Sequence, residues 1–291
     1  MTSVGLIYDF GVSTGLGHRR RMEALGAALS EAGHEVTLQP IHEVQTFAWQ
    51  LTVVDSYERR ADDLPSAAGP IAALDDLGRD LAVPLVVDPS PGAHPIRHYP
   101  ARVLAGPAYA LLDPALASLP VRPIGPTVER VLVTTGASPD DSAAGGAARV
   151  MAEAVAAQLG PGRVTLVRGS RHAEDLPRGV SALEAADGLG PHLSDYDIVL
   201  TAGGVTLLES LCLGRPTVAV AVAGNQQRAV EGAASAGACL AAPVERAAEQ
   251  AARLASDFSL RRRLSASARK LVDGRGAFRV ANAVAHLDRR R

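Results

Sequence analysis

The chain has 291 residues, a length that favours two domains over a single core. Its formal net charge is −2 and only 3% of its residues are aromatic, which argues against nucleic acid as the expected partner. No run of 18 apolar residues occurs, so no stable membrane insertion is expected.

Short apolar runs alternate with helical patterns through the first half of the chain. Residues 4–10 predict a buried strand, and residues 18–32 predict a helix whose apolar face contains Leu25 and Leu29. Gly33 suits the position just beyond that helix. Further strands are predicted at residues 35–40, 51–55, 84–88 and 102–106.

Three prolines, Pro120, Pro123 and Pro126, mark a candidate linker, because proline fixes the backbone and stops helices. The alternation then resumes. Strands are predicted at residues 128–136, 164–170, 180–185, 197–202 and 216–222. Helices are predicted at residues 142–160, 204–214 and 225–237 and through the last 45 residues.

The alternation predicts the α/β class, with parallel sheets covered by helices. We expect two Rossmann-like domains, one spanning residues 1–122 and the other residues 123–291. In this architecture ligands bind at the carboxyl ends of the strands, which predicts a site in the cleft between the domains. The final helix is expected to pack either back on the first domain or within the second.

The sequence "DFGVSTGLGHRRR" joins the first predicted strand to the first helix and carries Asp9, Gly15, Gly17 and His18. It is no dinucleotide fingerprint, because Arg20 occupies the place of the third glycine, and it is no P-loop. A helix N-terminus disfavours imidazolium, so His18 is predicted to be neutral and able to accept a proton. It is either a general base or a histidine that only caps or packs.

A second group of residues lies at the strand ends of the second half. Its glycines permit close approach of a ligand, and the helix that begins near Val205 offers N–H groups to a phosphate. Glu209 suits the two hydroxyls of a ribose. Taken singly, the glycines fit tight turns and Glu209 fits a solvent-exposed position, but their order and spacing favour a nucleotide site.

The motif order, D-x₅-G-x-G-H-x-x-R, VVDSY, LDD, GPAYALL and GGVTLLE…GRP…NQQ, resembles that of the UDP-sugar hydrolases of pseudaminic acid biosynthesis. Spore-coat polysaccharide biosynthesis proteins are related to this family, and the peptidoglycan GlcNAc transferase is similar to it. The resemblance runs from Val4 to about Gly237. It implies a GT-B fold, in which two Rossmann-like domains face a central cleft.

Together with the patterns above, the resemblance implies three groups of site residues. The expected catalytic residues are His18, Tyr57 and Asn225. The expected substrate-side residues are Asp9, Gly15, Gly17, Arg21, Asp55, Asp75, Asp76, Tyr109 and Gln226. The expected nucleotide-binding residues are Gly136, Gly203, Gly204, Val205, Thr206 and Glu209.

The resemblance implies cleavage of UDP from an amino- or deoxysugar, with inversion. His18 would activate water, and Asp55 would stabilise the developing oxocarbenium charge. The family's usual arginine and serine around Asp9 are replaced by Ile7 and Gly11, which leaves the sugar open. The alternatives are a GT-B glycosyltransferase, in which His18 activates an acceptor hydroxyl or amine, and a nucleotide-sugar-binding protein without activity.

Neither a metal nor a cofactor is expected. The two cysteines, Cys212 and Cys239, lie in apolar runs, which fits a reducing, cytoplasmic setting. The histidines show no convincing metal-ligand spacing, and the neighbouring side chains of Asp75 and Asp76 are expected to diverge. The sequence does not predict an oligomeric state.

Overall fold

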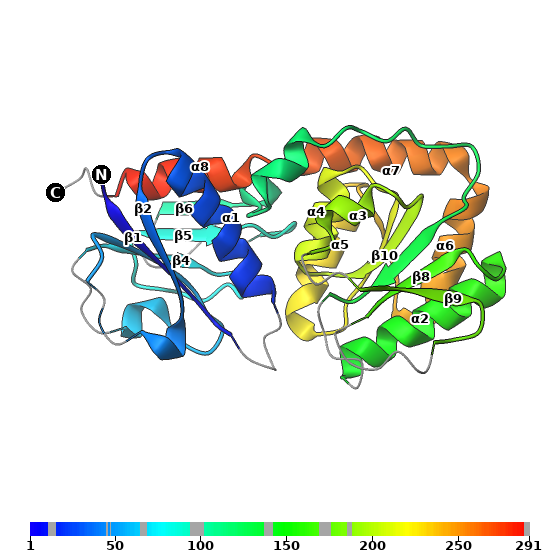
Figure 1. Ribbon diagram of the computed structural model, residues 1–291, viewed down its shortest axis with the longest axis horizontal. Coiled ribbons are helices and arrows are strands. Elements are labelled where there is room, and N and C mark those ends of the chain that lie inside the picture. The colour runs from blue at the N-terminus through cyan, green and yellow to red at the C-terminus, as the bar shows by residue number, and fades with distance from the viewer. Residues whose placement is uncertain are drawn as a thin grey trace. The chain divides into compact units, whose positions relative to one another are not determined.

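The computed structural model describes residues 1–10, 16–44, 46, 48–64, 69–93, 102–136, 142–168, 176–184 and 188–287. The chain divides into two compact units (Figure 1). Unit 1 consists of Met1–Ala115 and Gly274–Arg291, and unit 2 of Leu116–Asp273. The sequence predicts a boundary after residue 122 and allows the last helix to pack on either domain. The contacts place the boundary after Ala115 and assign the last helix to unit 1.

Unit 1 is built on one parallel sheet. Within the described residues its strand order is β2-β1-β3-β4-β5-β6, and every neighbouring pair is parallel. The strands are β1 (Ser3–Tyr8), β2 (Glu35–Pro40), β3 (Leu51–Asp55), β4 (Ile71–Leu74), β5 (Leu85–Asp88) and β6 (Arg102–Ala105). The α-helices of this unit are α1 (Gly17–Glu31) and α8 (Gly276–Ala285).

Side chains alternate between the two faces of this sheet, as the strand period requires. Leu6 and Val53 belong to the core that α1 and α8 cover. Ile7 and Val54 face the other way and pack with residues of two 3₁₀ segments, Ile41–Glu43 and Ala61–Asp63, and of the connecting loops. Both faces are buried, which explains why these strands read as continuous apolar runs.

The last helix, α8, completes the core of unit 1. It contacts α1 and the 3₁₀ turn Pro107–Tyr109, and its Val280 and Val284 are fully buried. Gly276 permits this approach. A Cβ there would overlap the carbonyl oxygen of Ala110 and lie 2.6 Å from the carbonyl carbon of Tyr109.

Unit 2 is also built on a parallel sheet. Its described strand order is β12-β11-β10-β7-β8-β9. The strands are β7 (Val131–Thr134), β8 (Val164–Arg168), β9 (Val180–Glu184), β10 (Ile198–Ala202), β11 (Thr217–Val220) and β12 (Leu240–Ala241). The helices are α2 (Ala143–Leu159), α3 (Gly190–Leu193), α4 (Val205–Cys212), α5 (Gln227–Ser235), α6 (Ala247–Ser256) and α7 (Phe258–Leu271).

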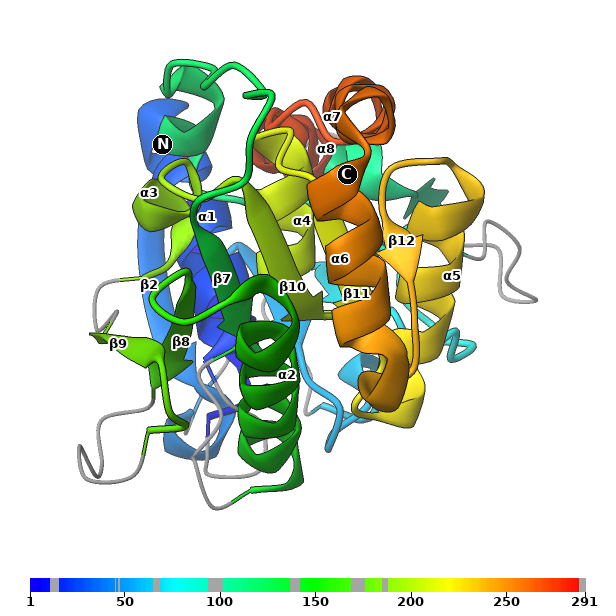
Figure 2. The ribbon, with the colours of Figure 1, turned by 90° about the vertical axis from the view of Figure 1, so that its right-hand side faces the viewer.

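Helices cover both faces of the second sheet. On one face α2 and α6 lie side by side, and Val155 and Leu254 pack with Ile198 of β10 (Figure 2). Val199 and Ala219 alternate with this set and point to the other face. They are also buried, with an exposed fraction of 0%. There α4 contacts β10 and β11, and α5 contacts β11.

Two strands are missing from the sequence predictions. The first, β4, is only four residues long, with the sequence IAAL, and alanine is a weak strand former. The second, β12, has two residues. Both form by pairing with neighbouring strands that are distant in the sequence, and a local sequence pattern does not reveal such pairing.

Within the described residues, no helix combines the length and the apolar character needed to cross a membrane.

We expect Gly276→Ala to destabilise unit 1 by about 3 kcal/mol, because the new methyl group must displace backbone. The single tryptophan, Trp49, belongs to unit 1, so its fluorescence in a denaturant titration reports this loss. Gly146→Ala in α2 is the control, since a Cβ there meets nothing within 4 Å. An unshifted Trp49 transition in Gly276→Ala contradicts the close approach of α8.

Candidate active site

The strand order of unit 1 reverses direction between β1 and β3, which gives a candidate ligand site at their carboxyl ends. The chain leaves β1 towards β2 on one side, whereas β3 to β6 follow on the other. In open parallel sheets such a switch point is where ligands bind. Asp9 directly follows β1, and Asp55 ends β3. The backbone N–H of Asp9 donates to the carbonyl of Asp55 at 3.1 Å, which joins these two positions.

His18 lies in the first turn of α1, close to this switch point. Its Nδ1 is 2.7 Å from Oδ1 of Asp55, and both side chains are buried. Nη2 of Arg21 also lies 3.1 Å from Nδ1, and an arginine only donates. Because the carboxylate of Asp55 is the closer of the two groups and only accepts, we assign the proton of neutral His18 to Nδ1. Neutral His18 then has its lone pair on Nε2. The ring of Tyr57 meets the ring of His18 edge-on, with centroids 4.4 Å apart, and fixes its orientation.

Arg21, one turn along α1, holds two carboxylates at once. Its Nε and Nη2 donate to the two oxygens of Asp55 at 2.8 and 2.7 Å, and its Nη1 donates to Oδ2 of Asp76 at 2.8 Å. The fork–fork contact with Asp55 has the geometry in which arginine binds carboxylates most strongly. The motifs predict Arg21 on the substrate side. Its hydrogen bonds instead give it the position of a residue that orients Asp55 and Asp76.

Charge and burial shift the pKa values of this network in opposite directions. Burial raises the pKa of the Tyr57 hydroxyl, which donates to Oδ2 of Asp76 at 3.0 Å. Burial opposes ionisation of Asp76 as well, but the Arg21 guanidinium and the Tyr57 hydrogen bond outweigh it and hold the pKa of Asp76 below its usual value. Burial also opposes the charge of Arg21, and the two carboxylates keep its pKa well above normal.

Asp9 is 2% exposed and belongs to the same network. Its Oδ2 accepts hydrogen bonds from the backbone N–H groups of Tyr57, at 2.6 Å, and Glu58, at 3.3 Å. Its Oδ1 is buried and has no hydrogen-bond partner among the residues that the structure describes. Asp9 therefore positions the Tyr57 segment with one oxygen and leaves the other unsatisfied.

Asp75 has a different surrounding from Asp76, as expected for neighbours at a strand end. The Nε of Arg79 donates to Oδ1 of Asp75 at 2.7 Å, and the backbone N–H of Arg79 donates to its Oδ2 at 2.7 Å. The Nη2 of Arg79 also donates to the carbonyl of Ser56 at 2.6 Å, which ties this turn to the end of β3. The sequence analysis missed Arg79, although its spacing of four from Asp75 in "DDLGR" is a visible signal.

The strand order of unit 2 places its switch point between β7 and β10. Gly136 follows β7, and Gly203 and Gly204 follow β10, so the predicted nucleotide-binding glycines flank this point. At Gly203 a Cβ would lie 2.7 Å from Cγ2 of Val230 and 2.9 Å from the carbonyl oxygen of Gln226. Only glycine fits there. At Gly204 a Cβ would meet nothing within 4 Å, so the space beside this backbone is open.

The structure brings several of the unit 2 residues together around the start of α4. Val205 and Thr206 form its first turn, where N–H groups lack partners within the helix. Glu209 lies one turn further on and is 8% exposed. Gln226 packs beside Gly203 and accepts a hydrogen bond from the backbone of Val222 at 3.0 Å.

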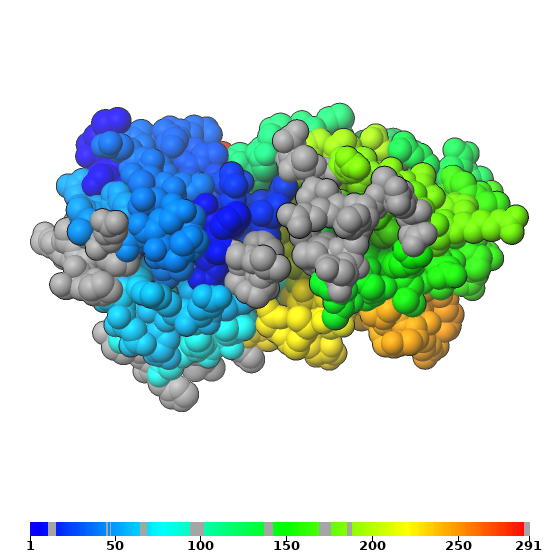
Figure 3. Space-filling model, turned by 60° about the horizontal axis from the view of Figure 1, so that its bottom comes forward, coloured from blue at the N-terminus to red at the C-terminus, as the bar shows by residue number. Residues whose placement is uncertain are grey.

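Asn225 lies in the turn Gly224–Gln226, just before α5. This segment, yellow in Figure 3, reaches the surface, and Asn225 itself is exposed. Its side chain makes no hydrogen bond or ion pair with the described residues of unit 2. Its predicted catalytic role remains a prediction.

The arginine of the "GRP" sequence has a structural position. Arg215 is 1% exposed and donates to the backbone carbonyls of Leu213, Tyr196 and Arg122. Burial, and then the nearby charge of Arg122, lower its pKa to about 10. The described bonds of Arg215 thus hold the junction between α4 and β11.

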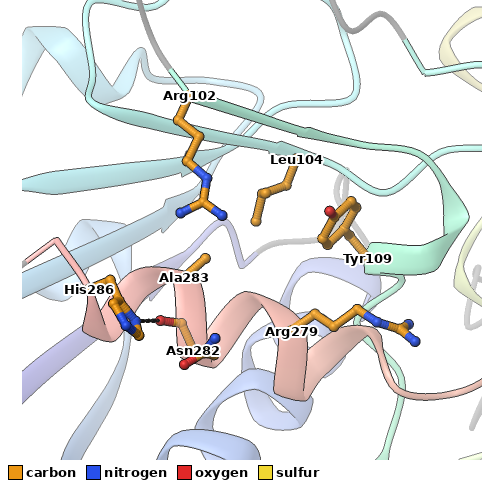
Figure 4. Close-up of a pocket in the computed structure, with 7 residues that line it drawn as sticks. All are labelled: Arg102, Leu104, Tyr109, Arg279, Asn282, Ala283 and His286. Atoms are coloured by element: carbon orange, nitrogen blue, oxygen red, sulfur yellow. Dashed lines mark hydrogen bonds between the residues drawn. The ribbon is translucent and has the colours of Figure 1, made fainter.

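Tyr109 packs against residues other than those of the His18 network. It packs on the core of unit 1 and, with six other residues, lines a cavity of about 290 Å³ between β6 and α8 (Figure 4). The others are Arg102, Leu104, Arg279, Asn282, Ala283 and His286. The substrate-side role expected for Tyr109 gains no contact with Asp9, Asp55 or Asp76 among the described residues.

Two glycines complete the set of predicted residues. Gly17 is the first residue of α1, directly before His18. Gly15 lies outside the described residues. Within the described part of the chain, no group of three or more His, Cys, Asp or Glu side chains is placed to hold a metal ion.

No family model matches the chain. A stretch of 104 residues is 30% identical to the spore coat polysaccharide biosynthesis protein SpsG of Bacillus subtilis (strain 168). This match covers 34% of the chain and 31% of SpsG, so the chain matches about a third of that relative's length.

Solved structures resemble the chain over nearly its whole length. MurG of Acinetobacter baumannii has a TM-score of 0.62 at 12% identity, covering 98% of this chain and 100% of MurG. The spinosyn rhamnosyltransferase SpnG complexed with thymidine diphosphate has a TM-score of 0.63 at 17% identity, covering 99% and 100%. The calicheamicin glycosyltransferase CalG4 has a TM-score of 0.61 at 15% identity, covering 99% and 98%.

The chain has the GT-B fold. This confirms the fold that the sequence motifs predicted. At these low identities the solved structures establish the fold alone, and the chemistry has to be argued from the residues of this chain.

We expect Arg21→Met to destabilise unit 1 by about 3–5 kcal/mol at pH 7, because Asp55 and Asp76 lose their buried guanidinium. Without it, the folded-state pKa of Asp76 should rise above the unfolded value near 3.8. The deficit is then largest well above that raised pKa and shrinks as the pH falls through it.

Trp49 fluorescence in denaturant titrations at pH 7 and at acid pH measures this deficit. Arg19→Met is the matched control, because Arg19 pairs with Glu23 at the surface, where both side chains are more than 40% exposed. Its expected cost is below about 1 kcal/mol. Equal costs for the two variants contradict the central role of Arg21.

Proposed function

We propose that the chain acts on a nucleotide sugar, displacing the nucleoside diphosphate from the anomeric carbon with a nucleophile that His18 deprotonates. The observation that carries this proposal is the bond between Nδ1 of His18 and Asp55. It assigns the proton to Nδ1 and leaves Nε2 as the base. When Nε2 takes a proton, the carboxylate of Asp55 stabilises the imidazolium that forms.

In the proposed reaction the two units have different roles. Unit 1 supplies the base and the polar groups for the sugar. Unit 2 binds the diphosphate at the first turn of α4 and the ribose at Glu209. No protonation of the leaving group is required, because a nucleoside diphosphate leaves as a stable anion. The GT-B fold and the open space beside Gly204 support this division.

The first candidate nucleophile is an acceptor hydroxyl or amine, which makes the chain a glycosyltransferase. Several proteins of the same fold are named as glycosyltransferases, among them SpnG, CalG4 and the spinosyn forosaminyltransferase SpnP. In this reaction His18, in the first turn of α1, would deprotonate the acceptor.

The second candidate is water, which makes the chain a hydrolase. One observation favours it: His18 is only 3% exposed, and a small nucleophile reaches a buried base more easily than a bulky acceptor does. The motif order described above points in the same direction.

We expect His18→Ala to lower kcat by about 100-fold to 10,000-fold with little change in KM, because general base catalysis contributes about this much. Release of nucleoside diphosphate from a panel of UDP- and dTDP-sugars is the measurement. His42→Ala is the control, since the His42 side chain is 58% exposed. Unchanged turnover in His18→Ala would remove the base from the mechanism.

The same assay separates the two nucleophiles. Release that requires an added acceptor identifies a transferase, and release in buffer alone identifies a hydrolase. If no sugar nucleotide reacts under either condition, the proposed activity is wrong.

We expect Gly204→Ala to weaken binding of UDP or dTDP by about 10-fold or more, because its methyl group occupies the open space beside the backbone. The fold should be unaffected, since no described atom lies within 4 Å of that methyl group. Isothermal titration calorimetry measures the affinity, with Gly146→Ala as the control. Wild-type affinity in Gly204→Ala contradicts the placement of the diphosphate.

A further inference from the structure

Among the described residues, Asp9 has no cationic partner of the kind that the other carboxylates of the unit 1 network have. Arg21 bonds to Asp55 and Asp76, and Arg79 bonds to Asp75. The recorded donors to Asp9 are two neutral backbone N–H groups, and both reach Oδ2. Its buried Oδ1 has no donor among the described residues. A buried carboxylate oxygen of this kind needs a hydrogen-bond donor, and a ligand can supply one.

The formal charge of the network points to the nature of that donor. Its described members carry four carboxylates, of Asp9, Asp55, Asp75 and Asp76, and two guanidinium groups, of Arg21 and Arg79. Asp9 is the carboxylate of this set that no described guanidinium meets. A neutral hydroxyl or amide of a ligand supplies a hydrogen bond to Asp9 but no positive charge. An ammonium group supplies both the hydrogen bond and positive charge.

Asp9 also lies where a bound sugar is expected. It follows β1 at the switch point of the sheet, and its backbone bonds to Asp55, the partner of His18. Its Oδ2 anchors the backbone of Tyr57, whose ring rests against the ring of His18. A group bound by Asp9 is therefore part of the same site as the base.

Building on the proposed function, we infer that the sugar carries a free, positively charged amino group, and that Asp9 binds it through Oδ1. This excludes sugars in which that amine is acetylated, because an acetamide is neutral and bulkier. It also excludes sugars with a carboxylate at that position, because the carboxylate of Asp9 would repel it.

Binding measurements test this inference independently of turnover. We compare sugar nucleotides that carry an amino, an acetamido or a hydroxyl group at C2, C3 or C4, each as the UDP and the dTDP derivative. Calorimetry in the His18→Ala background avoids consumption of the ligand. At one ring position the amino form should bind about 10-fold to 100-fold more tightly than both counterparts, because hydrogen bonds between charged groups contribute this much.

Asp9→Asn is the decisive variant. The asparagine oxygen can still accept from Tyr57 and Glu58, while its NH₂ group replaces the free oxygen with a donor. The preference for the amino form should fall to within about 3-fold. Asp63→Asn removes the same charge from a side chain that is 73% exposed and should retain the preference. Circular dichroism checks that both variants are folded.

Each outcome separates the inference from the proposed function. Equal binding of amino, acetamido and hydroxyl forms overturns the inference and leaves nucleotide-sugar binding in place. A preference that survives in Asp9→Asn overturns the assignment to Asp9. If no sugar nucleotide binds at any position, the inference and the proposed function both fail. Should Asp9→Asn not fold, the comparison of the three ligand forms still decides for or against the ammonium group.

Discussion

The charge of one buried guanidinium holds the candidate active site together. Arg21 bonds to Asp55, which orients His18, and to Asp76, which accepts from Tyr57. Three separate segments, α1, the end of β3 and the turn after β4, thus meet at one side chain. Burying ionisable groups is unfavourable unless each has a partner, and here the opposite charges and hydrogen bonds compensate one another. The opposite charges accordingly raise the pKa of Arg21 and lower the pKa of Asp76.

Both sheets have a switch point in their strand order, but different kinds of residues lie at it. In unit 1 the switch point between β1 and β3 carries ionisable side chains, which suit proton transfer and polar recognition of a sugar. In unit 2 the switch point between β7 and β10 carries glycines and the start of a helix, which suit an anion. Parallel strands place their carboxyl ends at one edge, so residues far apart in the sequence gather there without any local signal.

Much of this arrangement is readable from the sequence, and the remainder depends on long-range contacts. The alternation of apolar runs predicted the α/β class, and the motif order predicted the GT-B fold, which is confirmed. His18, Tyr57, Asp55 and Asp76 were nominated from their motifs, and the structure brings them into contact. Their partners could not be read: Asp55 is 34 residues from Arg21, and only folding decides which carboxylate a guanidinium meets. Strand β4 was missed for the same reason, since IAAL is a strand only beside β3 and β5.

The return of α8 to unit 1 has a consequence for the order of assembly during synthesis. Unit 2 is one continuous segment, so all of its residues are available once Asp273 has been made. Unit 1 has to wait, because Val280 and Val284 fill its core and come about 165 to 170 residues after Ala115. His18 leaves the ribosome about 260 residues before Val280, so the core beneath its helix is completed long after the helix itself has been made. A chain that stops before α8 therefore retains every candidate catalytic residue and lacks the packing that fixes their geometry.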